Sequence, residues 1–418
     1  MLTIAILGLG DRGMNYGNLS RQCPEAKIVA VCDKDPQRVS LALERFGLDR
    51  EQGYGDSQAF FAAGKLADVV FVCTQDRDHY GHTMEALKLG YHVMVEKPVS
   101  PNPEHLKEIR DLARQQNRKV VVCHVLRYSR FYQKIRELLQ SGIIGRTVLI
   151  RHSENVAYWH YIHSYVRGHW HREEETSPML LAKCCHDMDL LYWWVGSPFA
   201  SIYSQGGLTF YTPASAPEGA AKACFQCPHR DTCIYDARLQ YLGRADHPAP
   251  RFPWGTYAVS NQPEEAAITA ALQSNSYGRC VFAGDNNVVD YQTAEIRFEN
   301  GVVAQFPVNG FSNENYRKTH IFGTQGEIYC NDLEETITLH VFGQEKQVFD
   351  FSDPNSTGYG GGHVGGDLGL VQDVVALFTG KEVRQQQLTL IDETLESHQM
   401  VDACERSRKT GQVILRDK

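Results

Sequence analysis

The chain has 418 residues, of which 42% are hydrophobic and 22% are charged, and this composition is typical of a folded globular protein rather than a disordered or collagen-like one. Its formal net charge is −8 and it holds no long run of Lys and Arg, which excludes a general binder of nucleic-acid phosphates. At about 150 residues per domain, the length predicts two or three domains.

Short apolar runs alternate with helical patterns from residue 1 to residue 124. The apolar runs lie at residues 2–7, 27–32, 67–74, 92–95 and 119–124. Runs that are apolar on both faces are typical of parallel strands covered by helices on both sides. Helical periodicity fills residues 35–46, 79–90 and 103–116 between them. We therefore predict an α/β Rossmann domain, a doubly wound parallel sheet, over residues 1–124.

The pattern changes after residue 125. Helical stretches at 129–139 and 179–195 precede strand-like runs at 293–298, 302–308, 320–322, 327–329 and 336–341, and residues 385–409 are helical again. Asn300-Gly301 predicts a hairpin, because both residues tolerate positive φ. We predict an α+β domain over residues 125–418, with a large, mainly antiparallel sheet. Residues 212–258, rich in Pro, Ala and Cys, are predicted as an inserted module, and the glycine-rich residues 352–369 as a mobile loop.

The start of the chain lacks the basic segment of a signal peptide, and no apolar stretch approaches the roughly 20 residues that cross a bilayer. We expect a cytoplasmic protein with no membrane or nucleic-acid partner. In that compartment its 12 cysteines are expected to be reduced or metal-bound.

The first predicted strand runs directly into Gly8-Leu9-Gly10-Asp11-Arg12-Gly13. Glycines there permit a tight turn and a close approach of the backbone to a pyrophosphate at the start of the next helix. Asp33 follows at the end of the second strand, where its carboxylate can accept hydrogen bonds from a ribose 2′-hydroxyl. This predicts a dinucleotide site and favours NAD over NADP, unless Lys34 or Arg12 offsets the repulsion of a 2′-phosphate. The alternative is a structural glycine turn, with Asp33 capping the next helix.

Further motifs resemble a known family. They are Thr74, His79, Gly90-Tyr91-His92-Val93-Met94-Val95-Glu96-Lys97-Pro98 and His186-Asp187-Met188-Asp189. Together with the glycine motif, they resemble the family of glucose–fructose oxidoreductase, inositol dehydrogenase and MocA (Gfo/Idh/MocA) over most of the chain apart from residues 212–258. The resemblance implies an NAD(P)-dependent oxidoreductase acting on a CH–OH group of a sugar, sugar derivative, glycoside or cyclic polyol. It assigns the cofactor to Gly8, Gly10, Asp11, Arg12, Gly13, Asp33, Thr74, His79, Glu96 and Lys97.

The resemblance also implies catalytic residues. Lys97 would lie beside the nicotinamide and the substrate hydroxyl, aimed by a cis peptide before Pro98. An ammonium group there polarises the reacting oxygen and tunes a nearby acid or base. His186 would contact the substrate and exchange its proton. The alternative for Lys97 is a place in a surface turn.

The helix that carries His186 departs from the family pattern. Many members have an Asp where this chain has Ala182, and Lys183 stands beside it. Lys183, His186 and Asp187 share one helix face, so Asp187 would orient the His186 ring or pair with Lys183. The spacing leaves open whether Lys183 or His186 takes the hydroxyl proton. The alternative is a core helix whose polar residues pair locally.

Aromatic and imidazole side chains are dense between residues 152 and 171. Flat rings beside polar groups suit a polyhydroxylated ring, and we predict a substrate-binding segment. A solvated loop with incidental histidines is the alternative, and a metal site of His160 and His163 is less favoured because no third ligand is evident. His363 is expected in the glycine-rich stretch, either on a lid over the site or in a flexible loop. The predicted substrate-binding residues are Tyr128, Glu154, His160, His163, Arg167, Asp187 and His363, with Tyr128 alternatively a packed hinge residue.

The predicted module contains Cys224, Cys227 and Cys233. Three thiolates at this spacing can wrap one tetrahedral ion, with Cys280 as the fourth ligand and His229 as its rival. We expect a structural zinc ion that staples the module. An iron–sulfur cluster and free buried cysteines are the alternatives.

Two other functions share these residues. The chain would cleave a glycoside if transient oxidation to a ketone led to elimination, with NAD recycled. A sensor would bind NAD and a sugar without turnover. The family resemblance further implies a homodimer or homotetramer.

Overall fold

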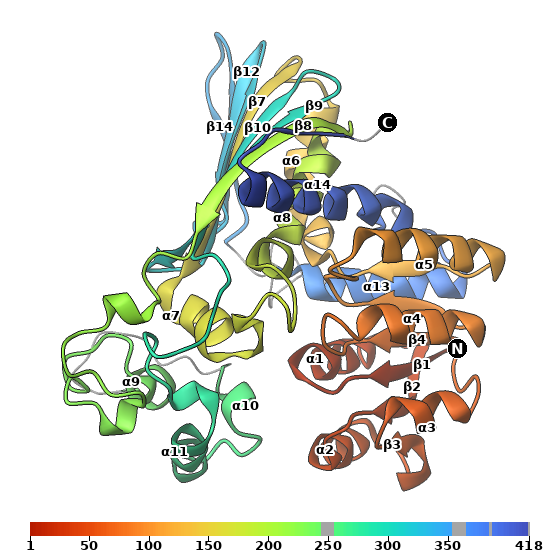
Figure 1. The fold of residues 1–418 in the computed structure, drawn as a ribbon. Helices are drawn as coiled ribbons and strands as arrows, with labels where there is room; N and C mark the ends of the chain where they lie inside the picture. Colours follow the sequence, from red (N-terminus) through yellow and green to blue (C-terminus); the bar gives the residue numbers. More distant parts are fainter. Residues whose placement is uncertain (244–254, 353–364, 384–386, 417–418) are drawn as a thin grey trace.

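A computed structural model describes residues 1–243, 255–352, 365–383 and 387–416. They form a parallel sheet at the N-terminus and a larger mixed sheet after it (Figure 1). The predicted fold class is confirmed. Within the described residues, no helix combines the length and the apolar character that crossing a membrane requires.

The parallel sheet has six strands in the order β3-β2-β1-β4-β5-β6. The chain reverses its direction of winding between β1 and β4, and ligands of open α/β sheets bind at such a switch point, outside the carboxyl ends of the strands. The strands are β1 (Leu2–Leu7), β2 (Ala26–Cys32), β3 (Gly53–Tyr54), β4 (Val69–Val72), β5 (His92–Val95) and β6 (Val120–Val122). The helices between them are α1 (Asp11–Ser20), α2 (Pro36–Phe46), α3 (Ser57–Ala62), α4 (His79–Lys88) and α5 (Pro103–Gln115).

A helix from the far end of the sequence completes the cover of this sheet. In α13 (Gly366–Thr379), Leu370 and Val374 are fully buried in the cluster that also holds Ile4 of β1. Val121 of β6 forms a β-bridge with Leu390, just before α14 (Ile391–Thr410). The chain therefore returns to its first domain near its end.

The mixed sheet has nine strands in the order β14-β13-β12-β11-β7-β10-β9-β8-β15. β10 pairs with β7 in parallel, and the other pairings are antiparallel. Helices α6 (Arg130–Gln140), α8 (Met179–Val195) and α14 lie on the face turned toward the parallel sheet (Figure 1). The strands are β7 (Thr147–Ala157), β8 (Phe199–Gly207), β9 (Tyr291–Phe298), β10 (Val303–Ser312), β11 (Tyr316–Gly323), β12 (Gly326–Asn331), β13 (Thr336–Val341), β14 (Gln347–Asp350) and β15 (Ile414–Leu415).

The predicted hairpin at Asn300-Gly301 is confirmed between β9 and β10. Gly301 has a φ of 87°, and its amide donates to the carbonyl oxygen of Phe298 at 3.0 Å. By contrast, the periodicity did not predict β7, which is central to the sheet. Its inward side chains are apolar at Ile150 but polar at His152 and Glu154, and all three are buried.

Residues 208–290, between β8 and β9, form an insertion that lies apart from both sheets (Figure 1). Its helices are α9 (Ala237–Leu242), α10 (Thr256–Val259) and α11 (Glu265–Ser274). It has a small core of its own, in which Tyr241 and Ile268 are fully buried beside Leu272 and Tyr277. The insertion therefore continues beyond the predicted boundary at residue 258.

Candidate active site

The turn between β1 and α1 can be built only from glycines at two of its positions. Gly8 has a φ of +96°, and a Cβ there would lie 2.5 Å from the carbonyl oxygen of Cys73. A Cβ at Gly13 would lie 1.9 Å from the carbonyl oxygen of Gly8. A Cβ at Gly10 would meet only Arg38, at 3.7 Å. The backbone of the turn is therefore packed tightly at Gly8 and Gly13. At Gly10 it is open, so an anion can approach the backbone amides at the start of α1.

Asp33 ties this turn to the end of β2. Its two carboxylate oxygens accept hydrogen bonds from the amides of Leu9, at 2.7 Å, and Asp35, at 2.9 Å. Each oxygen keeps a further lone pair, so the half-buried carboxylate can still accept bonds from ribose hydroxyls. The glycine turn and Asp33 fit a dinucleotide.

Arg12 and Glu96 are partners of each other. Arg12 Nε donates to Glu96 Oε1 at 2.8 Å, and Arg12 Nη2 donates to Asp367 Oδ1 of α13 at 2.7 Å. Glu96 also accepts from the hydroxyl of Tyr16, at 2.7 Å, and from the amide of Lys97, at 2.9 Å. Burial raises the pKa of Glu96, but the charges of Arg12 and Lys97 lower it by more. Arg12 and Glu96, which are predicted to bind the cofactor, therefore hold the backbone of Lys97 in place.

His79 braces the same turn from the other side. Its ring is 1% exposed and lies between the carbonyl oxygens of Pro98, 2.7 Å from Nδ1, and Thr74, 2.9 Å from Nε2. The hydroxyl of Thr74 lies 3.0 Å from Nδ1 of His82. The peptide between Lys97 and Pro98 is cis. His79 thus connects the end of β4 to the turn that presents Lys97.

Lys97 reaches across from the parallel sheet to the other domain. Its Nζ donates to the main-chain carbonyl oxygen of Ala182, in α8, at 2.7 Å. The side chain of Ala182 offers no acceptor, so the main chain supplies it. This contact sets Lys97 against α8, the helix that carries Lys183 and His186 within the next turn.

His186 lies in a group of buried imidazoles. Its ring packs edge-to-face on His124, at the end of β6, with centroids 5.8 Å apart. His124 packs in turn on His398 of α14, at 6.1 Å. Burial and the charges of Arg127 and Lys97 hold the pKa of His124 well below its usual range. His186 therefore has an uncharged imidazole beside it.

A buried ion network joins α8 to the mixed sheet. Lys183 Nζ lies 3.1 Å from Glu154 Oε1, on β7. Arg317, on β11, reaches Glu154 Oε2 at 2.7 Å and Asp187 Oδ1 at 2.6 Å. Asp187 also accepts from His152 Nε2 at 3.0 Å. Asp187 therefore pairs with Arg317 and His152 rather than with Lys183, and Glu154 is an ion-pair partner of Lys183.

The two buried carboxyl groups of this network differ in pKa. Burial raises the pKa of Glu154, and Arg317 and Lys183 offset this only in part. Burial also acts to raise the pKa of Asp187, but Arg317 and His152 lower it well below its usual value. Arg317 was not found from the sequence, because its pattern on β11 is that of any half-buried strand residue.

His160 is the member of the aromatic segment that lies with the lysines. Its Nδ1 is 2.9 Å from Oδ1 of Asn315. Burial lowers its pKa well below the usual range, and the charges of Lys183 and Lys97 lower it further. A half-buried imidazole within electrostatic reach of both ammonium groups suits a ligand with several hydroxyl groups.

Arg167 and His163 hold the insertion instead of lining this site. Arg167 is 1% exposed, and its guanidinium donates to the carbonyl oxygens of Arg279, at 2.8 Å, and Tyr235, at 2.6 Å, as well as to Gln240 Oε1, at 2.8 Å. His163 Nδ1 lies 2.7 Å from the hydroxyl of Tyr241, and its ring stacks on Tyr277. The predicted substrate role of these two residues is corrected to a structural one, because their polar atoms face the insertion.

Tyr128 has the packing role that the sequence left open. It is 1% exposed, its hydroxyl lies 3.0 Å from Oγ1 of Thr389, and it accepts from the amide of Thr389 at 3.1 Å. Its neighbour Arg127 makes two 2.7 Å hydrogen bonds to Asp189 of α8. Tyr128 is therefore removed from the predicted pocket lining.

Comparisons with known proteins decide the family. The profile described as "Oxidoreductase family, NAD-binding Rossmann fold" (GFO_IDH_MocA) matches residues 2–124, and the profile described as "Oxidoreductase family, C-terminal alpha/beta domain" matches residues 136–415. The chain belongs to the Gfo/Idh/MocA family of oxidoreductases. This confirms the resemblance drawn from the motifs.

Several known proteins are similar to the chain. The oxidoreductase YteT of Bacillus subtilis is 25% identical over 410 residues, covering 91% of this chain and 90% of its own. The D-glucoside 3-dehydrogenase of Escherichia coli is 34% identical over 146 residues, 34% of this chain and 40% of its own. A levoglucosan dehydrogenase solved with NADH and levoglucosan has a TM-score of 0.71 at 16% identity, with 100% of both chains covered. At that identity the match shows the fold alone.

The predicted metal centre is not assembled. Within the described residues, no group of three or more His, Cys, Asp or Glu side chains could hold a metal ion. The thiol of Cys224 is occupied by Arg167, whose Nη2 donates to Sγ at 3.4 Å, and His229 Nε2 lies 2.8 Å from the carbonyl oxygen of Glu218. The guanidinium of Arg167 lies where a metal ion would bind the thiol of Cys224, so neither zinc nor an iron–sulfur cluster is supported. The other predicted ligands, Cys227, Cys233 and Cys280, are half-buried free cysteines.

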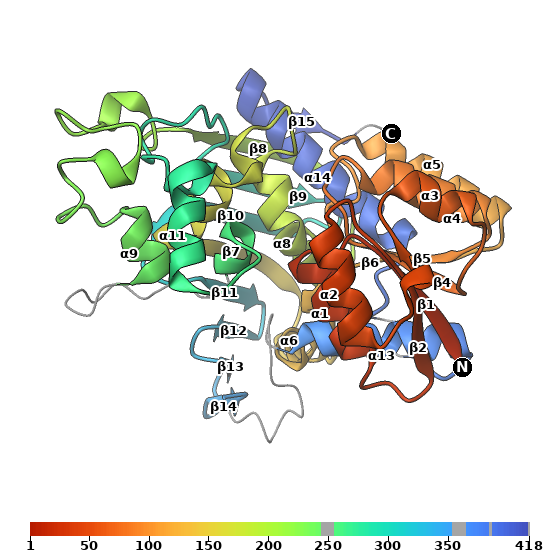
Figure 2. The same cartoon turned by 90° about the horizontal axis from the view of Figure 1, so that it is seen from below.

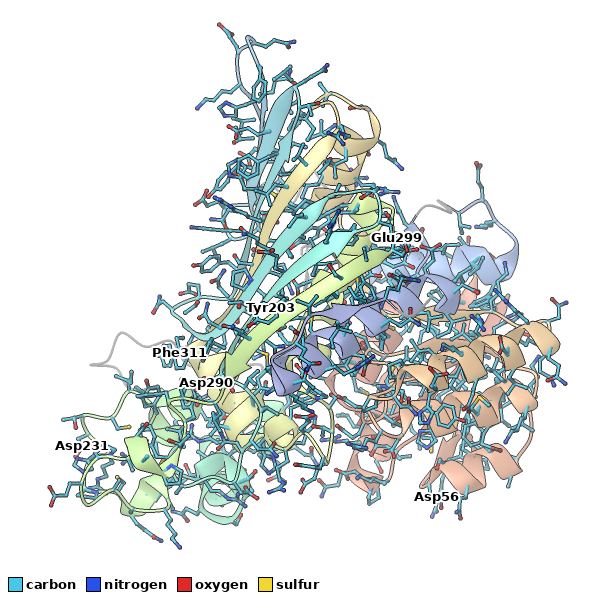
Figure 3. The ribbon with its side chains drawn as sticks, turned by 45° about the horizontal axis from the view of Figure 1, so that its top comes forward. Asp56, Tyr203, Asp231, Asp290, Glu299 and Phe311 are labelled. Atoms are coloured by element: carbon cyan, nitrogen blue, oxygen red, sulfur yellow. The ribbon has the colours of Figure 1, made fainter. Side chains whose placement is uncertain are left out.

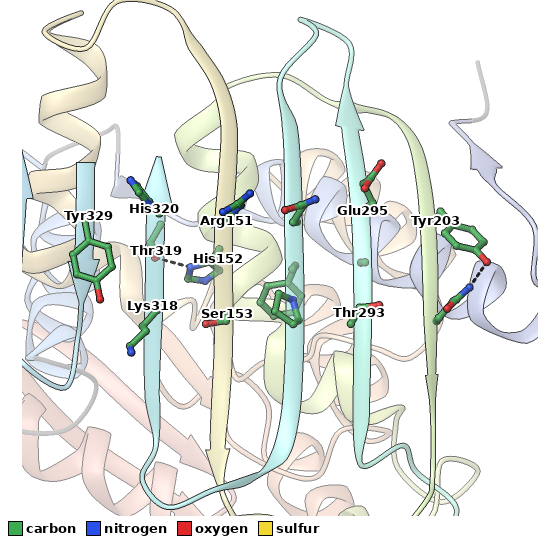
Figure 4. Close-up of a pocket in the computed structure, with 15 residues that line it drawn as sticks. Arg151, His152, Ser153, Tyr203, Thr293, Glu295, Lys318, Thr319, His320 and Tyr329 are labelled. Atoms are coloured by element: carbon green, nitrogen blue, oxygen red, sulfur yellow. Dashed lines mark hydrogen bonds between the residues drawn. The ribbon is translucent and has the colours of Figure 1, made fainter. Parts of the chain in front are cut away.

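His363 falls outside the described residues. A hollow of about 530 Å³ lies on the outer face of the mixed sheet (Figure 4), and Arg151 and Ser153 line it together with residues of β8 to β12. Side chains alternate along a strand, so Arg151 and Ser153 face this hollow while Glu154 faces α8. The hollow is therefore on the opposite side of the sheet from Lys183 and His186.

Proposed function

We propose that this chain oxidises a CH–OH group of a sugar, sugar derivative, glycoside or cyclic polyol. The observation that carries the proposal is the 2.7 Å contact between Lys97 Nζ and the carbonyl oxygen of Ala182. It sets an ammonium group from the cofactor domain against the helix of Lys183 and His186. Relatives named D-glucoside 3-dehydrogenase and inositol 2-dehydrogenase support this substrate class.

Oxidation of a CH–OH group to a carbonyl releases one hydride, which bound NAD accepts, and one proton, which the chain must take. Lys97 holds and polarises the hydroxyl oxygen. His186 takes the proton, with Lys183 as the alternative base. Lys183 Nζ is engaged with Glu154 Oε1 at 3.1 Å, and this supports His186 as the base. His160 orients the ring of the substrate.

We propose NAD as the cofactor rather than NADP. Gly8, Gly10, Asp11 and Gly13 would hold the pyrophosphate and Asp33 the ribose, whose 2′-phosphate the Asp33 charge would repel. Arg12 is committed to Glu96 and Asp367, so its charge does not offset that repulsion. Thr74 is proposed to border the nicotinamide half.

Incubation with NAD and a panel of sugars, cyclic polyols and aryl glycosides tests the proposal. We expect substrate-dependent formation of reduced nicotinamide, or release of the aglycone if elimination follows oxidation. Lys97→Met lowers kcat about 10²- to 10⁴-fold, while the control Lys88→Met, at an exposed position of α4, leaves it unchanged. A wild-type protein that binds NAD and sugar without turnover of any member of the panel would be a sensor instead.

We also propose that the chain forms a homodimer or homotetramer through the outer face of the mixed sheet. Tyr203 is 37% exposed there and Tyr329 is 38% exposed, and Figure 3 shows Tyr203 on this face. Exposed apolar side chains on a wide sheet suit a self-association surface. Light scattering after chromatography measures the mass, and a mass of about one chain would contradict the proposal.

A further inference from the structure

The insertion touches the cofactor domain beside the predicted ribose site. Asn261, between α10 and α11, donates from Nδ2 to Asp35 Oδ2 at 2.9 Å and to Gln37 Oε1 at 3.3 Å. Asp35 is the N-cap of α2, where its other oxygen accepts from the amide of Gln37 at 2.9 Å. Figure 2 shows α11 on the same side of the molecule as α1 and α2. Segments far apart in the sequence therefore meet at the start of α2.

Asp35 transmits this contact to the glycine turn. The amide of Asp35 donates to one oxygen of Asp33 at 2.9 Å, and the amide of Leu9 donates to the other at 2.7 Å. Burial acts to raise the pKa of Asp35, but the hydrogen bond from Asn261 and the charge of Arg38 lower it by more. The interaction with Asn261 therefore favours the charged carboxylate, and the path from Asn261 to Leu9 of the turn consists of three hydrogen bonds.

Arg38 occupies the space between the turn and the insertion. Its Nη1 would lie 3.7 Å from a Cβ at Gly10, the open position of the glycine turn. Burial raises the pKa of Tyr277, in the insertion, to about 12, and the charge of Arg38 opposes this shift. Burial lowers the pKa of His169, and the charge of Arg38 adds to this shift. Arg38 therefore lies beside the turn and within electrostatic reach of the insertion and of the aromatic segment.

A second set of contacts joins the two domains on the other side of the turn. Trp170 Nε1 donates to Asp76 Oδ2, after β4, at 3.1 Å, and Arg77 Nη2 donates to the carbonyl oxygen of Glu173 at 3.2 Å. In the sheet order β2-β1-β4, the glycine turn after β1 lies between these two crossings. A dinucleotide on that turn is therefore bridged on both sides.

The insertion is attached firmly enough to act as a wall. Arg167, which is 1% exposed, joins the segment after β7 to two separate segments of the insertion through the carbonyl oxygens of Tyr235 and Arg279. The stacked pair of His163 and Tyr277 adds a second attachment. Because the insertion is held by the second domain at these points, the contact of Asn261 with Asp35 also positions it against the cofactor domain.

We propose that the insertion forms an outer wall of the dinucleotide site and slows the release of NAD, with Asn261 as a positioning residue for Asp33. This rests on the proposed function only in that the chain binds NAD. A slowly released cofactor suits a reaction that returns the hydride to the substrate after elimination, because one bound NAD then serves successive turnovers.

Dissociation of the cofactor measures this directly. Protein loaded with NADH is mixed with excess NAD, and the loss of bound-NADH fluorescence gives the dissociation rate constant. Asn261→Ala raises it about fivefold, because the lost hydrogen bond to a carboxylate is exposed to solvent. Asn261→Asp raises it about tenfold or more, because it sets two carboxylates against each other. The control Gln262→Ala, at the neighbouring exposed position, leaves the rate unchanged.

Two comparisons separate the possible outcomes. Unfolding in urea is expected at the same midpoint for all four proteins, so that a faster release reports the contact and not a loss of fold. Hydrogen exchange of residues 255–280 slows on addition of NAD to the wild type and less in Asn261→Asp. Equal dissociation rates in all four proteins would overturn the role of the insertion while leaving NAD binding intact. Failure of the wild type to bind NADH would overturn both this inference and the proposed function.

Discussion

Replacing Arg317 by Met removes the cation at the centre of the buried ion network. Arg317 lies 2.7 Å from Glu154 and 2.6 Å from Asp187, whose side chains are 1% and 0% exposed. Met preserves much of the apolar volume but leaves both carboxylates buried without this partner. Removing one member of a buried ion pair costs about 3–5 kcal/mol. Lys183 and His152 still face the two carboxylates, so we use the figure for one pair rather than two.

A loss of this size is a large part of the stability of a domain. It multiplies the unfolding constant by about a hundred to several thousand, against a total free energy of unfolding of about 5–15 kcal/mol. Because Arg317 also fixes the inward face of α8, we expect kcat to fall as well, through displacement of His186. The loss of stability is the sharper measure, since it does not require the substrate.

The effect depends on pH with a definite sign. In the wild type, burial acts to raise the pKa of Asp187, but Arg317 and His152 depress it. A carboxyl group with a depressed folded pKa stabilises the protein above its unfolded pKa of about 3.9, and this contribution is lost as the pH falls through the folded value. Without Arg317, burial raises the folded pKa of Asp187 and Glu154, so the variant recovers stability by protonation at acid pH. The difference between the two proteins is therefore larger at about pH 7 than at about pH 5.

Urea denaturation followed by tryptophan fluorescence at both pH values measures this difference. Arg297→Met, at an exposed position of β9, is the matched control and is expected to change the free energy of unfolding by less than about 0.5 kcal/mol. Arg317→Lys keeps the charge but loses the fork that spans the two carboxylates, so we expect an intermediate loss. The reasoning is refuted if Arg317→Met matches the control, or if its loss is the same at both pH values.

Three further substitutions test single contacts. Gly13→Ala is expected to prevent NAD binding in a calorimetric titration, because its Cβ would lie 1.9 Å from the carbonyl oxygen of Gly8; unchanged affinity would show that the turn can relax. Asp33→Asn should weaken the binding of NAD about tenfold and reduce the preference for NAD over NADP. Equal effects on the binding of both cofactors would contradict the contact of Asp33 with the ribose. Tyr128→Phe should lower the free energy of unfolding by about 1 kcal/mol through the lost bonds to Thr389, with KM unchanged; a raised KM would return Tyr128 to the substrate site.

The cofactor domain could be predicted from short stretches of sequence. Parallel strands are buried on both faces, so each is a continuous apolar run that needs no knowledge of its neighbours. The glycine turn is equally local, because the clash that excludes a Cβ at Gly13 comes from Gly8 in the same turn. The hairpin at Asn300-Gly301 follows from the positive φ that these residue types accept. In each case the constraint lies within a few residues.

The polar part of the site was decided only by the tertiary structure. In β7 the inward side chains His152 and Glu154 are polar and buried. The strand therefore lacks the alternation of apolar and polar residues that predicts a strand, and its second half falls in the predicted substrate-binding segment. Arg317, which compensates Glu154 and Asp187, comes from a distant strand. Nothing in the local sequence identifies that partner.

The same distinction explains the roles that were reassigned. The residue types of Arg167 and Cys224 permit a substrate contact and a metal ligand, but the fold sets the guanidinium against the thiol at 3.4 Å. Residues 366–379 form a helix with an apolar face that is suited to many apolar surfaces. Only the tertiary structure shows that this face packs on the parallel sheet. Backbone sterics and strand burial act over short distances along the chain and are encoded there. Which charges neutralise one another is settled only when remote segments are brought within a few ångströms, because a buried charge takes whatever partner the packing provides.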